Sequence, residues 1–274
     1  MRSNGGGVSV DLQNISVAST ALKGLLERLT IRSLDGIRPA AESLHEIAMS
    51  LGLRTAACAN IASKAPMVDG SGAILAAEVF GWCKPSERWW NRPRLALTSP
   101  LTIACRYESD PFWCNKNGVH TQQYNLHLAG LDLSDFFERA LTAGAIVIPL
   151  HLSYGQIAVV SFQPVDSEHT DLSWEFGEYG ELLGVCARRF ISSYVKVMNK
   201  SQWISPDVRL SKRENECLRW AAVGKTDGEI AVILSRSCAT IRFHIHNAAM
   251  KLNAVNRSQA VFKAGQLGYL GSAN

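Results

Sequence analysis

The sequence predicts an α+β protein in which an N-terminal α-β-α sandwich domain is followed by an all-α domain of four helices. Three observations favour this fold class: helical and strand-like hydrophobic periods alternate up to residue 198, helical periods alone fill the tail, and turn-forming residues separate the two parts. A length of 274 residues suits two domains. We expect a flexible N-terminus over residues 1–16, a first domain over 17–198, a linker over 199–209 and a second domain over 210–274.

The overall composition is that of a folded protein, with 47% hydrophobic and 19% charged residues. Seven cysteines are present, an odd number, and none of them forms a Cys-x-x-Cys pair. Free thiols in a reducing cytoplasm fit this pattern better than a disulfide framework or a zinc site. The sequence has no apolar signal core near its N-terminus and no run of ~20 apolar residues. We therefore expect a soluble, cytoplasmic protein that contacts no membrane and holds no metal.

Hydrophobic spacing predicts the elements of the first domain in order. Leu22, Leu25, Leu26 and Leu29 recur at the spacing of a helix face, and a second helix is expected over 39–51. Two strand-like stretches follow, separated by turn residues, and then an irregular segment rich in aromatic side chains. The predicted ranges are 55–62 and 73–82 for these strands, 83–129 for the irregular segment, 133–143 for a helix, 146–152 and 156–163 for two further strands, and 172–198 for a long helix.

The net positive charge of the chain lies in the tail. From Leu210 onward it holds nine Lys or Arg and four Asp or Glu residues. A basic segment suits a polyanionic partner, although a solvated basic surface is the alternative.

Local signals divide the tail into four short helices. The first is expected over 212–223 and ends at Gly224. Thr226 and Glu229 have the spacing of a capping box that opens the second helix. Ser237 opens a third helix reaching about residue 253, and Asn256 is the expected N-cap of the last, over 257–267.

The third helix is amphipathic in a way that suggests a DNA groove. Ile241, Ile245, Ala248 and Leu252 form a buried stripe, whereas Arg242 and Phe243 point the other way. An arginine can bind guanine or phosphate, and an outward phenylalanine can contact a thymine methyl group. The predicted DNA contacts are Thr240, Arg242, Phe243 and His246 on this helix, with Lys225 and Lys251 as phosphate contacts.

The tail resembles the LuxR-type helix-turn-helix domain at many fixed spacings. The matching residues are Leu210-Ser-Lys-Arg-Glu214-Asn-Glu216-Cys-Leu218, Gly224-Lys225-Thr226, Glu229-Ile230-Ala231, Ser237, Thr240-Ile241-Arg242, His244, Lys251-Leu252 and Asn256-Arg257. The resemblance implies that the third helix lies in the major groove of double-stranded DNA and that the fourth helix dimerises on DNA. It also admits RNA polymerase as a partner.

The first domain resembles the autoinducer-binding domain of quorum-sensing LuxR proteins. The matching segments are Ser99-Pro100, Asp110-Pro111-Phe112-Trp113, Phe137-Glu138-Arg139-Ala140, Ala145-Ile-Val-Ile-Pro149-Leu150-His151 and Gly155-Gln156-Ile157-Ala158. The resemblance implies an aromatic pocket for an acyl-homoserine lactone. The candidate ligand-binding residues are Trp89, Trp90, Ser99, Tyr107, Trp113 and Ala145.

Departures from the family pattern affect this pocket. Ser99 stands where the family has an aspartate that accepts the ligand amide, and a serine accepts without charge and with a shorter reach. Ala145 replaces a family glycine, and the family's Trp-x-x-x-Tyr pair has no clean counterpart beside Trp89 and Trp90. We favour a signal other than an ordinary lactone, or none, over a lactone receptor with altered contacts. Plain core packing is the alternative for the aromatic side chains.

Three function classes follow from these patterns. The leading hypothesis is a homodimeric regulator that binds a two-fold-symmetric promoter site and is tuned by a small molecule. The second is a ligand-free protein that inhibits another LuxR-type regulator by forming heterodimers, although Thr240, Arg242 and Lys225 are retained. The third, an enzyme, is disfavoured: the sequence has no phosphate-binding loop, nucleophile elbow or metal spacing, and we assign no catalytic residue.

Overall fold

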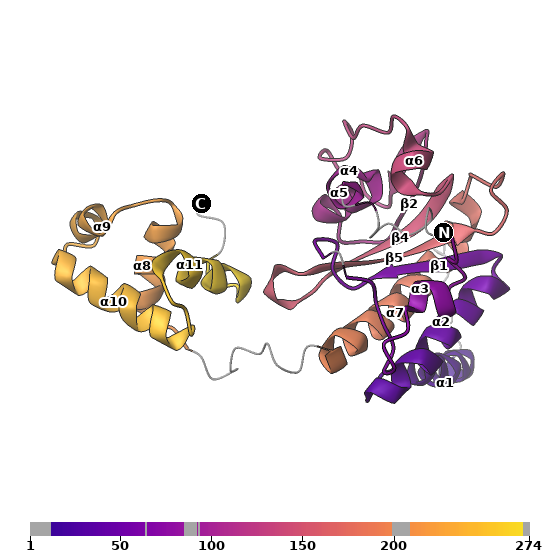
Figure 1. Cartoon of the computed structure of the whole chain (residues 1–274), viewed down its shortest axis with the longest axis horizontal. Helices are drawn as coiled ribbons and strands as arrows, with labels where there is room; N and C mark the ends of the chain where they lie inside the picture. Colours follow the sequence, from indigo (N-terminus) through magenta and orange to yellow (C-terminus); the bar gives the residue numbers. More distant parts are fainter. Residues whose placement is uncertain (1–11, 64, 85–91, 93, 199–208, 271–274) are drawn as a thin grey trace, which may run out of the picture. The chain divides into compact units, whose positions relative to one another are not determined.

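A computed structural model of the chain describes residues 12–63, 65–84, 92, 94–198 and 209–270. The chain divides into two compact units, residues 1–150 with 157–198 and residues 151–156 with 199–274. Figure 1 shows both units, and each is described by itself. The expected linker, apart from Arg209, and residues 1–11 of the expected flexible N-terminus lie outside the described residues.

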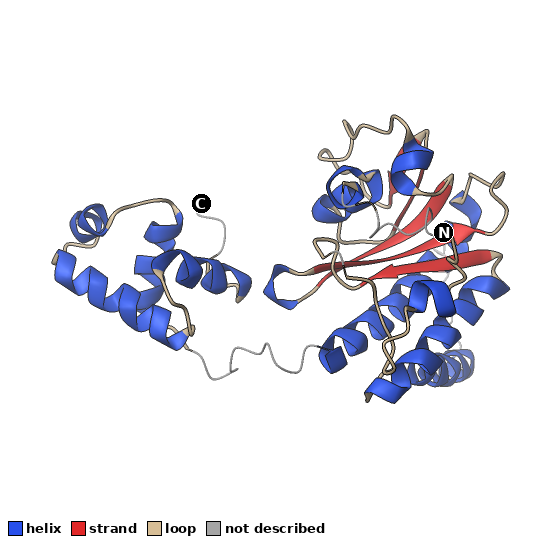
Figure 2. Cartoon of the chain, in the orientation of Figure 1, coloured by secondary structure: helices blue, strands red, loops and turns tan. Residues whose placement is uncertain are grey.

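A five-stranded sheet forms the centre of the first unit (Figure 2). The strands are β1 (Leu53–Cys58), β2 (Phe112–Asn115), β3 (Gly118–Thr121), β4 (Gly144–His151) and β5 (Ile157–Pro164), in the order β1-β5-β4-β2-β3. The pairs β1–β5, β2–β3 and β2–β4 are antiparallel. Arg54 lies opposite Gln163, and Ala56 opposite Ser161. Because strand side chains alternate between faces, these four residues share one face of the sheet.

Helices cover both faces of this sheet, as Figures 1 and 2 show. One layer contains α1 (Leu12–Arg28), α2 (Ile37–Ser50) and α7 (Ser173–Met198), and the other contains α4 (Leu95–Thr98), α5 (Pro100–Tyr107) and α6 (Phe136–Ala140). Leu183, Cys186, Phe190 and Tyr194 form the buried stripe of α7 at helical spacing. The predicted α-β-α sandwich is confirmed. None of the helices in the described ranges combines the length and the apolar character needed to cross a membrane.

The predicted strand over residues 73–82 is wrong. The segment forms a short helix, α3 (Leu75–Glu78), and Ile74 makes an isolated bridge with Val68. The sequence Leu-Ala-Ala-Glu consists of good helix formers, and its apolar residues misled the strand prediction. The indole of Trp82 then donates a hydrogen bond of 2.7 Å to the carbonyl of Thr55 in β1.

Two further expectations for the first unit need correction. Helix α1 begins at Leu12, so residues 12–16 are helical rather than loose. The segment expected to be irregular, 83–129, contains α4, α5 and the β2–β3 hairpin. These elements have eight residues or fewer, which is too short for hydrophobic periodicity to reveal them.

The second unit contains the four predicted helices within two residues of their expected bounds. They are α8 (Lys212–Ala222), α9 (Asp227–Ile233), α10 (Cys238–Lys251) and α11 (Arg257–Gln266). One core cluster joins α8, α9 and α10 through Cys217, Ile230, Ile241 and Ile245. Another joins α8, α10 and α11 through Leu218, Ala248, Leu252, Ala260 and Ala264. Helix α10 contributes to both clusters, so its orientation is fixed along its length.

Candidate DNA-binding face and ligand cavity

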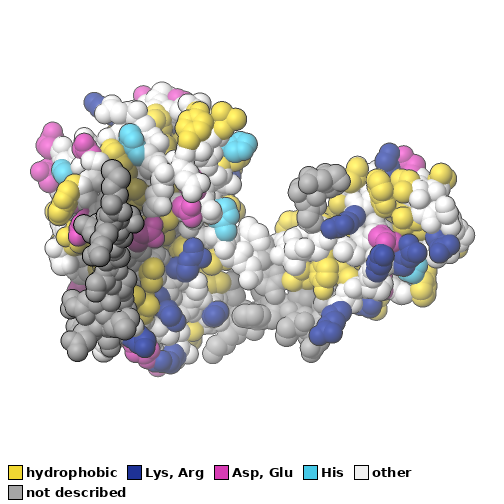
Figure 3. Space-filling model, turned by 180° about the vertical axis from the view of Figure 1, so that it is seen from behind, with side chains coloured by type: hydrophobic (Ala, Val, Ile, Leu, Met, Phe, Trp, Pro, Cys, Tyr) yellow, Lys and Arg dark blue, Asp and Glu magenta, His cyan; other side chains and the backbone are white. Residues whose placement is uncertain are grey.

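Helix α10 presents the residues predicted to contact DNA on its exposed side. The side chain of Arg242 is 72% exposed and Phe243 is 60% exposed, whereas Ile241 and Ala248 are fully buried. His246 is also exposed. Figure 3 shows Lys and Arg side chains gathered on one face of the second unit. The helix therefore offers a basic and apolar surface of the kind that reads base edges.

The start of α10 is fixed by a serine cap. The Ser237 hydroxyl accepts a hydrogen bond of 3.1 Å from the backbone N–H of Thr240. The two hydroxyl groups of Ser237 and Thr240 also lie 2.8 Å apart. Thr240, a predicted DNA contact, is thus half-buried and engaged in capping the helix that would carry it.

Arg242 belongs to an ion-pair cluster that joins three helices. Its Nε lies 3.5 Å from Oδ2 of Asp227, the first residue of α9. The other carboxylate oxygen of Asp227 accepts a hydrogen bond from Arg257, which also donates at 2.6 Å to the carbonyl of Lys225. Asp227 therefore connects Arg242 of α10 to the N-terminus of α11.

The two predicted phosphate contacts have different surroundings. Lys225 makes an ion pair of 3.3 Å with Glu229, which closes the capping box of α9 with Thr226. The backbone N–H of Thr226, followed by its hydroxyl and by Lys225, lowers the pKa of Glu229 to about 2. Both charges are on a partly exposed helix start, where a phosphate can reach Lys225.

Lys251 is engaged with a buried carboxylate. Its Nζ lies 2.8 Å from Oε2 of Glu214, whose side chain is only 5% exposed. Burial raises the pKa of Glu214, but hydrogen bonds from Lys251 and from the N–H of Ser211 more than offset this and lower it. Lys251 consequently fastens the end of α10 to the capping box at the start of α8.

A mainly apolar cavity of about 100 Å³ lies in the first unit between the sheet and the layer of α4, α5 and α6. Ser99, between α4 and α5, is buried at its wall. Ser161 and Gln163 of β5 are buried polar residues on the sheet side, and the amide of Gln163 donates to the Ser161 hydroxyl at 3.3 Å. The lining comprises Ala56, Ala57, Cys58, Ile61, Ala76, Trp82, Leu95, Ser99, Leu101, Thr102, Arg139, Ala140, Leu141, Val159, Ser161 and Gln163.

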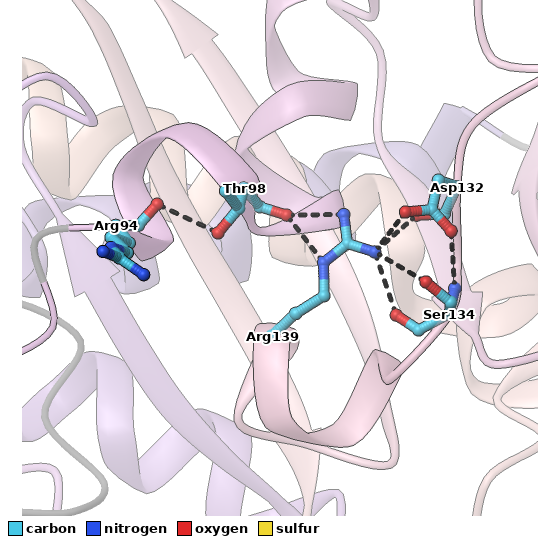
Figure 4. A network of polar contacts seen from close by, with 5 residues as sticks. All are labelled: Arg94, Thr98, Asp132, Ser134 and Arg139. Atoms are coloured by element: carbon cyan, nitrogen blue, oxygen red, sulfur yellow. Dashed lines mark hydrogen bonds and ion pairs between the residues drawn. The ribbon is translucent and has the colours of Figure 1, made fainter.

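Arg139 fastens the helical wall of this cavity (Figure 4). Its Nε and Nη2 donate to the carbonyl of Thr98 at 3.0 and 2.7 Å, at the end of α4. Its Nη1 donates to the carboxylate of Asp132 at 2.7 Å and to the carbonyl of Ser134 at 2.9 Å. The guanidinium thus connects α6 with α4 next to Ser99 and with the loop before α6.

The predicted ligand residues are not all brought together. Ser99 lines the cavity, and Ala145 is fully buried in a core cluster with Phe112 and Cys114. Trp113 alternates with those two residues of β2, so it projects from the opposite face of the sheet, where it stacks on His120 at 3.9 Å. Tyr107 is 53% exposed and stacks on His127. Trp89 and Trp90 lie outside the described residues.

Of the residues that line the cavity, sequence reasoning proposed only Ser99 as a ligand contact, and Trp82, Arg139 and Gln163 are among those it missed. Val159, Ser161 and Gln163 alternate along β5 and therefore share one face. Polar side chains on a buried strand face are costly unless they are hydrogen-bonded, so this pattern could have indicated a polar site. Trp82 gave no signal, since its place depends on the short helix that sequence reasoning took for a strand.

The Cys58 thiol in the cavity wall is not activated, and the described residues offer no site for a metal ion. Burial raises the pKa of the Cys58 thiol to about 12, despite a hydrogen bond from the backbone of Asn60. A thiol that stays protonated acts as an apolar wall. Within the described ranges, no group of three or more His, Cys, Asp or Glu side chains is placed to hold a metal ion.

Sequence comparison associates the tail with one family of regulators. Residues 208–264 match the GerE family, described as "Bacterial regulatory proteins, luxR family". This segment contains α8, α9, α10 and most of α11.

Curated relatives align with different lengths of the chain. Transcriptional activator protein VanR of Vibrio anguillarum is 35% identical over 123 residues, which are 45% of this chain and 50% of VanR. Transcriptional activator protein AhyR of Aeromonas hydrophila is 27% identical over 194 residues, which are 70% of this chain and 73% of AhyR. The chain therefore spans half of the first relative and about three quarters of the second.

A solved structure has the same fold. The crystal structure of Escherichia coli SdiA superimposes with a TM-score of 0.50 at 17% identity, covering 93% of this chain and 100% of that one. At this identity the likeness supports the two-part architecture described above.

Proposed function

We propose that the chain is a DNA-binding transcription regulator of the LuxR type, not an enzyme, and that it binds a two-fold-symmetric promoter site as a homodimer. The match of residues 208–264 to the luxR family of bacterial regulatory proteins supports this proposal. In this proposal α10 lies in the major groove and a small molecule in the cavity of the first unit tunes the affinity. The observation that carries the proposal is the pair Arg242 and Phe243, exposed side by side on a helix whose opposite face is buried. Met250, seven residues further along α10, is 67% exposed, so the apolar surface on this helix is larger than one side chain.

The DNA contacts divide into two kinds. Arg242 and Phe243 are proposed to read bases, since a guanidinium can bind guanine and an aromatic ring can contact a thymine methyl group. Lys225, with His246, is proposed to contact phosphates, which fix register but carry no sequence information. Thr240 holds the helix start in place by capping, and Lys251 adds to α10 packing, so a phosphate contact by either residue is secondary.

Ligand tuning rests on the cavity of the first unit. A small apolar space with three buried polar residues, Ser99, Ser161 and Gln163, has the composition of a site that orients an amphipathic molecule. We place the ligand there rather than against Tyr107 or Trp113, which lie away from it. An acyl-homoserine lactone and a different signal are both compatible with this placement.

The organisation follows from the same proposal. Residues 17–198 are the ligand domain, 199–209 the linker and 210–274 the DNA-binding domain, with an N-terminal segment before them. A dimer would place two copies of α10 about one helical turn of DNA apart. A regulator of chromosomal promoters acts in the cytoplasm, and contact with RNA polymerase would follow from binding beside a promoter.

The experiment that tests the proposal selects binding sites from random DNA duplexes with the purified full chain. Enrichment of a symmetric motif, followed by a footprint of both half-sites, supports it. Loss of enrichment with Arg242→Ala, while that variant keeps the thermal stability and the solution mass of the wild-type chain, identifies the contact. If no motif is enriched but the chain removes another regulator from its own promoter, the heterodimeric inhibitor replaces the proposed function.

A further inference from the structure

A larger pocket that opens to solvent, the open pocket, adjoins the cavity of the first unit, which is itself about equally open. Its volume is about 440 Å³, and it shares the side chains of Trp82, Leu141 and Gln163 with the cavity. A single molecule could therefore place one end in the apolar cavity and the other end in the open pocket.

The open pocket is rich in positive charge. The described residues that line it include three cations, Arg54, Lys84 and Arg92, and one carboxylate, Glu138. The cavity itself is lined mainly by apolar side chains. The two spaces thus have complementary character, one suited to hydrocarbon and the other to an anion.

Arg54 is held in place but lacks a full set of partners. Its guanidinium carbon lies 3.6 Å from the ring centroid of Trp82, whose indole is itself fixed by the hydrogen bond to Thr55. Its Nε is buried and has no hydrogen-bond partner in the described part of the chain. A buried donor without an acceptor is costly, and an anionic oxygen is the acceptor that suits a guanidinium best.

The strand register places this donor beside the cavity. Arg54 of β1 lies opposite Gln163 of β5, and Gln163 lines both spaces. Arg54 therefore lies next to the hydrogen-bonded pair Gln163 and Ser161, whose polar side chains lead from the open pocket into the cavity.

We propose that the ligand of the first unit is an amphipathic carboxylate, whose anionic group binds Arg54 in the open pocket and whose apolar part enters the cavity. This inference rests on the proposed ligand-tuned function. Lys84 and Arg92 add long-range attraction for the anion. The apolar part is a short acyl chain, since the cavity of about 100 Å³ is smaller than the roughly 150 Å³ that accommodates benzene. A neutral lactone leaves the Nε of Arg54 with a weaker acceptor.

The test compares two matched pairs of compounds by calorimetry and thermal shift on the full chain. One pair is N-hexanoyl-homoserine, a carboxylate, and its neutral lactone; the other is hexanoate and hexan-1-ol. The carboxylates are expected to bind about tenfold more tightly than their neutral partners, the advantage given by a charge-assisted hydrogen bond. That advantage should shrink as salt rises from about 0.05 to about 0.5 M.

Variants identify the residue responsible. Arg54→Gln should remove the preference for the carboxylate. The neutral compounds should still bind, which shows that the variant is folded. Lys84→Gln and Arg92→Gln should each reduce the preference for the carboxylate a few-fold. Lys116→Gln removes one exposed cation from the β2–β3 hairpin, outside both linings, and should change nothing.

The two proposals can fail separately. If the neutral lactone binds as tightly as its open form, or if Arg54→Gln weakens both members of a pair equally, the inference is overturned and ligand tuning stands. If none of the four compounds binds or stabilises the chain, the inference fails together with the ligand-tuned part of the proposed function.

Discussion

Arg242 and Asp227 face each other across α10 and α9, with Nε of Arg242 3.5 Å from Oδ2 of Asp227. Arg257 from α11 engages the other oxygen of the same carboxylate. The carboxylate thus restrains a highly exposed guanidinium that the proposed function assigns to base reading. Restraint of this kind orients the side chain before DNA arrives and lowers the entropy lost on binding.

Arg242→Ala should weaken binding to the selected duplex by about 1–3 kcal/mol and relax the preference at one base pair. The reason is the loss of a bidentate contact to a base edge, which a methyl group cannot replace. Fluorescence anisotropy with the selected duplex and with single-base variants measures both effects. Arg32→Ala, an equal change on the first unit, is the control, and unchanged affinity and preference in Arg242→Ala would reject the role.

Lys225→Gln should weaken binding to all duplexes alike. Removing one phosphate contact lowers the slope of log affinity against log salt concentration by about one, because one fewer counterion is released. A salt titration from dilute to moderate buffer measures the slope. A change of base preference without a change of slope would instead make Lys225 a base contact.

Lys251→Met should destabilise the second unit by about 1–3 kcal/mol, because it removes the charged partner of the buried Glu214 carboxylate. Urea unfolding of the full chain measures the effect. In the double variant with Glu214→Gln, the loss should be smaller than the sum of the two single losses, since the two residues share one interaction. Additive losses would show that the ion pair contributes nothing to stability.

Acid should weaken the second unit through Glu214 and Glu229. Both carboxyl groups have folded-state pKa values below the unfolded value of 4.5, and that of Glu229 falls to about 2. The unfolded chain therefore binds more protons in this window, so the stabilisation is complete above about pH 4.5 and is lost as the pH falls toward 2. Urea midpoints measured through this window should fall, and Glu229→Gln should flatten the decline. A steeper decline in that variant would contradict the assignment.

Arg139→Met should destabilise the first unit by about 1–3 kcal/mol, since it removes the hydrogen bonds that fasten α6 to the end of α4. Ligand affinity should fall as well, because the wall that carries Ser99 loses its support. Asp132→Asn is the matched comparison: it leaves the bonds to Thr98 in place, and the exposed Asp132 side chain should contribute no more than about 1 kcal/mol. Equal effects of the two variants would mean that the carbonyl bonds are unimportant.

The sequence by itself determined the second unit almost completely. The capping boxes at Ser211 and Thr226, the cap at Asn256 and the buried stripe of α10 are local patterns, and each helix starts and ends where such a pattern predicts. The exposed face with Arg242 and Phe243 follows from the same periodicity. Long elements of the first unit, such as α7 and β4, were predictable for the same reason.

Only the tertiary structure decided which residues surround the cavity and which cations are already engaged. The cavity combines β1, β5, α4 and α6, which meet through a strand order that differs from the sequence order. Trp113 faces away from it because a shift of one residue along a strand exchanges the faces of the sheet. Lys251 of α10 donates a hydrogen bond to Glu214 of α8, which lies 37 positions away in the sequence. Such contacts depend on how separate elements pack together, and that information is not contained in any local stretch of the chain.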